Sequence, residues 1–152
     1  MNQIRTFALA VGLLVLVLGS ATRADEKDEK ALKELQGNYR IVGIEAKGLK
    51  VTEEDLKKKD SGGKMVIKGD QLIAHDEDGK EDPATIKLDV SQKPPHITIT
   101  PKDGKSEVMH GIYKFENGVL TICLTEDPKN RPKEFKVEEK NIILTLKKQP
   151  AK

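Results

Sequence analysis

The sequence predicts an all-β domain, an antiparallel meander of about eight or nine strands with little helix. Short segments with alternating apolar residues follow one another from residue 64 to the C-terminus. Turn-forming pairs separate them at short intervals: Gly69-Asp70, Asp78-Gly79, Pro94-Pro95, Asp103-Gly104 and Asn117-Gly118. No helical segment of about 10–15 residues lies between consecutive strands, which excludes parallel βαβ units. A sheet of this length closes into a barrel or folds into a sandwich, because open edges promote aggregation.

Residues 1–24 have the three parts of a secretory signal peptide. A start that contains Arg5 precedes the uncharged run TFALAVGLLVLVLG, and small residues follow it. The run is shorter than the span of about 20 residues that a membrane helix needs. We expect cleavage after Ala24, with Thr22 three positions before the cut, and export to the periplasm or out of the cell. Cleavage after Ala21 and an uncleaved membrane anchor are the alternatives.

The predicted mature chain carries no net charge. The full sequence has 27 basic and 25 acidic residues, and residues 1–24 hold Arg5 and Arg23 but no acidic residue, so 25 of each sign remain. Electrostatic binding of nucleic acid needs a basic excess on one face, so we expect no nucleic-acid partner. A single cysteine, Cys123, excludes an internal disulfide, and the domain must be stabilised by packing alone.

Two short helices are predicted ahead of the main run of strands. Residues 25–36 combine a charged lead-in with a short helix that Gly37 ends. Its apolar residues have helical spacing: Ala31, Leu32 and Leu35. Residues 51–60 begin with a candidate N-cap, Thr52, and run from acidic residues to lysines, which suits the helix dipole. We expect a helical turn there, between the first two strands.

The predicted strand domain covers residues 37–148, and residues 149–152 form a tail. Its long first strand, residues 38–48, alternates with period two. The other strands are eight short runs: 64–68, 71–75, 84–90, 96–100, 108–116, 119–124, 133–137 and 141–148. Pro128 and Pro132 interrupt the pattern near residues 133–137, so the strand count stays open there.

The turn at residues 117–118 sets the register of the hairpin around it, and residues paired across a hairpin share a face. Tyr113 and Ile122 then lie on an apolar face that we assign to the interior. Cys123 and Ile112 pair on the opposite, mixed face. The same reasoning along the other strands predicts an interior set that would also line any ligand cavity: Met65, Ile67, Leu72, Ile86, Leu88, Ile97, Ile99, Met109, Tyr113, Ile122 and Leu144.

The sequence contains little that indicates catalysis. His110 and Cys123 share the mixed face, which makes a Cys–His dyad one hypothesis, and an acid pair within residues 76–82 is another. No strand-to-helix elbow, oxyanion loop or third orienting group accompanies the dyad. We interpret Cys123 instead as a small apolar residue packed beside Ile112. We therefore predict a protein that is not an enzyme and has no catalytic residues.

Metal and cofactor motifs are also missing from the sequence. Residues 75–82, HDEDGKED, lack the EF-hand spacing, so we interpret them as a solvated hairpin turn. The histidines His75, His96 and His110 come from different strands, whereas zinc ligands usually form close pairs. No phosphate-binding glycine loop occurs, and the few aromatic residues disfavour a stacking platform for sugars or single-stranded nucleic acid. We predict no metal and no cofactor.

Three motifs together resemble the lipocalin-like domain of the Planctomycetes uncharacterised domain family, a group of exported bacterial proteins. They are LQGNYRIVGIEAKG, GIYKFENGVLTICL and RPKEF, and the similarity covers residues 35–147. The resemblance implies a small antiparallel up-and-down, lipocalin-like β-barrel, closed or half-open, that a short N-terminal helix enters. It implies no activity, because the family has no assigned function. The usual Gly-x-Trp reads Gly37-Asn38-Tyr39 here, so lipocalin ligand affinity does not follow from it.

The predicted function is a non-catalytic, exported binding module for a small apolar ligand in the barrel interior or for a partner protein of the envelope. Side chains that fill the barrel completely would exclude the ligand. Four outward apolar residues would then offer a strip for a partner: Val66, Ile73, Ile112 and Val119. Two alternative functions are open. The protein could be a hydrolase, or it could inhibit exported enzymes by presenting the loop 102–107.

Overall fold

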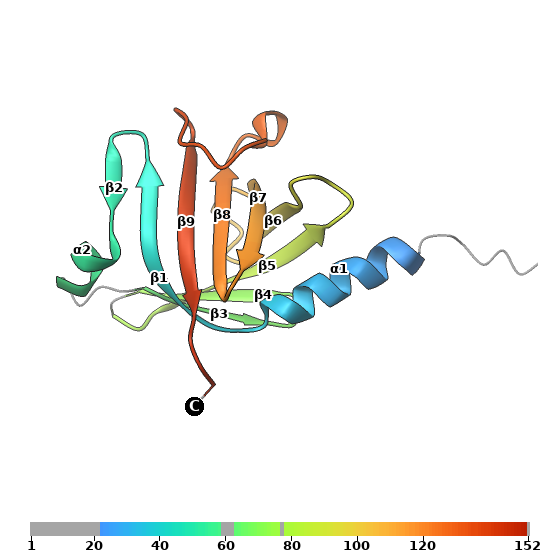
Figure 1. Ribbon diagram of the computed structural model, residues 1–152, viewed down its shortest axis with the longest axis horizontal. Coiled ribbons are helices and arrows are strands. Elements are labelled where there is room, and N and C mark those ends of the chain that lie inside the picture. The colour runs from blue at the N-terminus through green and yellow to red at the C-terminus, as the bar shows by residue number, and fades with distance from the viewer. Residues whose placement is uncertain (1–21, 59–62, 77, 152) are drawn as a thin grey trace, which may run out of the picture.

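The computed structural model describes residues 22–58, 63–76 and 78–151 (Figure 1). Within these ranges it contains two α-helices, one 3-10 helix and nine strands. In chain order they are α1 (Thr22–Leu35), β1 (Gly37–Ala46), β2 (Leu49–Val51), α2 (Glu53–Lys58), β3 (Lys64–Lys68), β4 (Gln71–His75), β5 (Glu81–Asp89), β6 (His96–Pro101), β7 (Met109–Glu116), β8 (Val119–Thr125), η1 (Pro128–Asn130) and β9 (Asn141–Lys148). None of these helices is both long and apolar enough to cross a membrane.

Eight of the described strands close into an antiparallel barrel. The strands from β3 to β9 pair with their sequence neighbours, and β1 joins the two ends because it pairs with both β3 and β9. A shift of register between Ile41 and Gly43 accompanies the long β1–β9 pairing, as is common where a strand bends to close a barrel. This confirms the all-β barrel and excludes the sandwich.

Strand β2 lies outside the barrel and extends a hairpin from the end of β1 (Figure 1). It pairs only with residues 44–46 of β1, while β3 pairs with residues 37–40. One edge of β1 therefore pairs with β3 in its first half and with β2 in its second half. Strand β2 was not predicted, because its three residues are too few to show a period of two. The predicted helical turn is present as α2, directly after β2.

The prediction of a strand at residues 133–137 is wrong. Residues 131–140 instead form an irregular connection between η1 and β9. We call residues 126–140, which include η1, the strap. Pro128 begins η1, and the buried Pro132 follows it. Because neither proline has a backbone N–H to donate to a ladder, this part of the chain leaves the sheet.

The strap covers the outer face of the barrel instead of extending it. Ile112, Cys123 and Ile143 form a small buried cluster there, and Phe135 and Val137 pack against it. The predicted position of Cys123 beside Ile112 on the outer face is confirmed. The prediction of an outward apolar strip is wrong for Ile112, which is fully buried, and the other three residues of the strip are half-buried.

Helix α1 closes one end of the barrel, which we call the closed end. Leu35 is 1 % exposed and belongs to the main core, where the Tyr39 hydroxyl donates to its carbonyl over 2.8 Å. Burial of one such leucine stabilises the fold by roughly 1.5–3 kcal/mol. The helix begins earlier than predicted, so the charged lead-in is helical as well, and the predicted cleavage position, Ala24, lies within it. The rest of the predicted signal peptide, residues 1–21, is outside the described residues.

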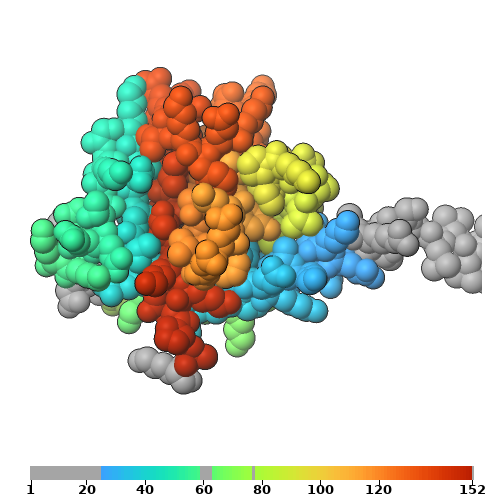
Figure 2. All heavy atoms as spheres, viewed as in Figure 1, coloured from blue at the N-terminus to red at the C-terminus, as the bar shows by residue number. Residues whose placement is uncertain are grey.

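Several hydrogen bonds hold α1 across the closed end. The Gln36 side chain donates to the Gly69 carbonyl over 2.9 Å and accepts from the Gly69 N–H over 2.6 Å. Asp28 accepts from the Val90 N–H after β5, and Lys148 at the end of β9 donates to a carbonyl of α1. Toward its N-terminus the helix leaves the body of the molecule (Figure 2). Since these contacts come from three separate barrel segments, they fix the position of the helix over the barrel.

Candidate functional site

The end of the barrel opposite α1 carries a hollow, which we call the mouth pocket. It has a volume of about 680 Å³ and lies where β7 begins, β8 ends and β9 begins. Because these strands are antiparallel, their other ends meet the closed end, where the β7–β8 turn and the end of β9 lie. The pocket is lined by Glu107, Met109, Leu124, Thr125, Glu126, Asp127, Lys140, Asn141 and Ile142.

The floor of the mouth pocket is apolar. Leu124 and Ile142 are paired across β8 and β9, and Met109 is paired with the core residue Ile99. All three belong to the main core or pack directly on it, but Met109 and Ile142 are only half-buried. The packed interior therefore ends one layer below the opening, and that last layer presents apolar side chains to the hollow.

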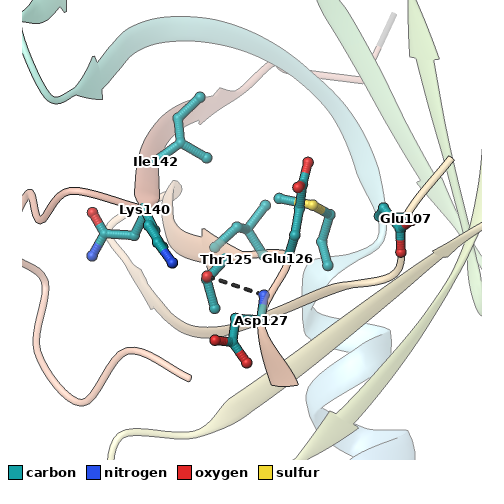
Figure 3. Close-up of a pocket in the computed structure, with 9 residues that line it drawn as sticks. Glu107, Thr125, Glu126, Asp127, Lys140 and Ile142 are labelled. Atoms are coloured by element: carbon teal, nitrogen blue, oxygen red, sulfur yellow. Dashed lines mark hydrogen bonds between the residues drawn. The ribbon is translucent and has the colours of Figure 1, made fainter. Parts of the chain in front are cut away.

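The side chains next to the floor are polar and satisfied. Thr125 and Asn141 are paired on β8 and β9 and are 3 % and 8 % exposed. The Asn141 amide accepts from the Glu138 N–H over 2.8 Å and donates to the Lys136 carbonyl over 2.9 Å. The Thr125 hydroxyl accepts from the Asp127 N–H over 3.3 Å (Figure 3). These bonds fix both ends of the strap, so one wall of the pocket has a defined shape.

Four charged side chains surround the opening: Glu107, Glu126, Asp127 and Lys140 (Figure 3). Asp127 caps η1, since its carboxylate accepts from the Lys129 N–H over 2.9 Å and from the Asn130 amide over 2.6 Å. These bonds and the nearby Lys140 charge hold the pKa of Asp127 below its usual range, so it is an anion at neutral pH. The Asp127 carboxylate is thus already engaged by two hydrogen bonds within the protein.

The structure places all eleven predicted interior residues in or against the main core. Eight are buried, and Met65, Met109 and Leu144 are half-buried against them. Only Met109 of this set lines the mouth pocket, because the other ten lie deeper or on other parts of the wall. Their interior position follows the predicted faces, and their contact with a ligand stays a prediction. Eight of the nine pocket residues were not in the predicted set.

The environment of Cys123 is that of a packed apolar residue. Its side chain is fully buried, and desolvation raises the pKa of its thiol to about 11. A nucleophilic thiol needs the opposite shift and access to substrate. His110, the proposed dyad partner, directs its Nδ1 atom to Arg131 Nη2 at 3.3 Å. The structure therefore gives the dyad hypothesis no support from geometry or from electrostatics.

Arg131 joins the strap to the barrel wall. Its guanidinium donates to the carbonyls of Ile97 and Gly111 over 2.8 and 2.6 Å, and to the Thr98 hydroxyl over 3.1 Å. Burial and then the Arg131 charge lower the pKa of the neighbouring His96. Sequence reasoning missed this residue, because an arginine in an irregular connection has no periodicity that would show where it points.

The other predicted sites show structural contacts. In the acidic hairpin the Asp76 carboxylate accepts from the Lys80 N–H over 2.7 Å and so shapes the turn. His75 lies 3.9 Å from a carboxylate oxygen of Glu81 on the paired strand. Among the described residues, no group of three or more His, Cys, Asp or Glu side chains is arranged to hold a metal ion.

Neither protein-family models nor curated proteins nor solved structures give a match to this chain. The strand pairing alone establishes the closed antiparallel β-barrel, and the family resemblance stays a prediction from the three motifs.

Proposed function

We propose that this chain is an exported, non-catalytic binding module that takes a small apolar ligand in the mouth pocket. The observation that carries the proposal is the difference between the two barrel ends. Helix α1 seals one end with Leu35 and Tyr39, whereas the other end keeps an apolar floor below an open hollow.

The dimensions of the hollow support a small ligand. Its volume of about 680 Å³ falls in the range of about 300–1,000 Å³ typical of small-molecule pockets. Most of the interior is closed to water, since residues such as Ile97 and Ile122 are 1 % exposed. We therefore expect the ligand to rest on Met109, Leu124 and Ile142 near the mouth and not to reach the barrel centre. The signal-peptide pattern of residues 1–24 supports an exported location.

The first experiment is native mass spectrometry of residues 25–152, purified without detergent. A mass above that of the polypeptide that disappears on denaturation would reveal a carried ligand. The purified protein is then titrated with N-phenyl-1-naphthylamine, an apolar dye whose fluorescence rises when it leaves water. We expect a saturable rise with one dye molecule per chain.

Two matched variants locate the binding site. Ile142→Trp fills the mouth pocket from its floor, while Ile73→Trp adds the same side chain at a half-buried position on the outer face. We expect Ile142→Trp to lose the dye signal and Ile73→Trp to keep it, with circular dichroism showing that both variants fold. Absence of dye binding by the unmodified chain, or equal binding by both variants, would refute the proposal and direct the search to protein partners.

A further inference from the structure

We infer that the mouth pocket prefers an apolar molecule with one positively charged group, such as a long-chain amine, over the same molecule with a carboxylate. The inference rests on the proposed function and specifies the class of ligand. The apolar floor and the charges around the opening support it.

The lining holds one lysine, Lys140, together with the carboxylate of Asp127. Hydrogen bonds are the main cause of the low pKa of Asp127, and the Lys140 charge adds a weaker attraction through space. Asp127 also caps η1 through two hydrogen bonds. Lys140 and Asp127 together add no net formal charge to the lining. A carboxylate ligand that approached Lys140 would also be repelled by the Asp127 carboxylate in the same lining.

The other two acids of the lining are not matched. Glu107 and Glu126 are exposed, and neither has a hydrogen bond or an ion pair with any residue of the described chain. They come from different segments, since Glu107 precedes β7 and Glu126 follows β8. The lining as a whole therefore has a formal net charge of two negative charges. The Glu107 and Glu126 carboxylates approach the hollow from different segments of the chain.

These two acids lie where the head of a bound ligand would be. Glu107 is two residues before Met109, and Glu126 is two residues after Leu124, so each acid is next to a floor residue on its own segment. The hydrophobic effect places the apolar part of the ligand on the floor. Its polar end is then directed to the opening, where Glu126 lies between Lys140 and Glu107 in the view of Figure 3.

The expected preference is moderate, because both carboxylates are exposed to water and salt. Attraction of the amine and repulsion of the carboxylate act in the same direction. We expect the amine to bind about tenfold more tightly than the carboxylate at low ionic strength. High salt should reduce the difference to about twofold, because exposed charges are screened.

The test compares three probes with one chain length: dodecylamine, dodecanol and dodecanoate. Each displaces N-phenyl-1-naphthylamine from the protein at neutral pH, in low and in high salt. The variant carries Glu107→Gln and Glu126→Gln, which remove both charges and keep the side-chain shape. Its matched control carries Glu54→Gln and Glu116→Gln, two exposed glutamates that do not line the pocket.

We expect the order amine, alcohol, carboxylate for the unmodified chain and for the control, and similar affinities for all three probes in the Glu107/Glu126 variant. Equal binding of amine and carboxylate by the unmodified chain would overturn this inference and leave the apolar site intact. A preference that survives in the Glu107/Glu126 variant would overturn it as well. If none of the probes displaces the dye, or if the dye itself does not bind, the proposed function fails together with the inference.

Discussion

Gly111 in β7 marks the point of closest approach between two barrel strands. A Cβ atom added there would lie 2.1 Å from the Cys123 carbonyl oxygen and 2.8 Å from Leu124 Cδ2. Real Cβ contacts essentially never fall below 3.0 Å. Gly111→Ala would therefore push the backbones of β7 and β8 further from each other, by about 1 Å. Here the glycine is needed for space, because its backbone lies in a region open to any residue.

We expect Gly111→Ala to lower the free energy of unfolding by about 3 kcal/mol, at the upper end of overpacking effects, because the closest contact is with backbone. In a domain of this size the melting temperature should fall by about 10 °C. Gly43→Ala is the matched control, also in a barrel strand. Its added Cβ would meet the Thr145 side chain at 3.4 and 3.5 Å and the Val51 carbonyl oxygen at 3.9 Å, which are ordinary van der Waals distances.

Thermal unfolding followed by circular dichroism, with urea titrations for the free energy, separates the two variants. Gly43→Ala should stay within about 1 kcal/mol of the unmodified protein, since it also reduces the entropy of the unfolded chain. A Gly111→Ala variant as stable as the unmodified protein would refute the reasoning. It would mean that β7 and β8 are further apart than described.

Three other predictions concern the closed end, the strap and the cysteine. Tyr39→Phe removes the hydrogen bond to the buried Leu35 carbonyl and should cost about 1–2 kcal/mol in urea titrations. Burial raises the pKa of Tyr39 from 10.0 to about 12, so the stabilisation that its neutral hydroxyl gives is complete below pH 10 and is lost as the pH rises toward 12. The free energy of unfolding of Tyr39→Phe should therefore fall less steeply over this pH range than that of the unmodified protein. Equal slopes for the two proteins would contradict this. Arg131→Met should cost about 2–3 kcal/mol and speed tryptic cleavage within the strap, whereas an unchanged cleavage rate would show that Arg131 does not hold the strap. Cys123, buried and with a pKa of about 11, should react with iodoacetamide only as fast as the protein unfolds, and rapid labelling of the folded chain would count against the described packing.

The local parts of this fold could be predicted from the sequence. The turn at residues 117–118 has positive φ at both positions and pairs Ile112 with Cys123 as predicted. The turn at residues 69–70 pairs Ile67 with Leu72, and both residues were predicted to face the interior. In each case a short turn and a period of two determine the register, and both are properties of neighbouring residues.

Other features depend on contacts between distant residues. The strap residue Phe135 was predicted to belong to a strand. Two prolines keep this segment out of the sheet, and Phe135 packs instead against the outer cluster of Ile112, Cys123 and Ile143. Arg131 finds its carbonyl partners 20 and 34 residues away along the chain. No local pattern records such pairings, because they arise only when the barrel wall has formed.

The sequence by itself therefore determined the eight barrel strands, their faces and the apolar interior, because side-chain alternation and turn chemistry act over a few residues. The tertiary structure decided that β9 pairs with β1 and that α1 closes only one end. It also placed Glu107 and Glu126, which are 19 residues apart in the chain, at one opening above Met109. The candidate site is a consequence of barrel closure, and closure is a property of the whole chain.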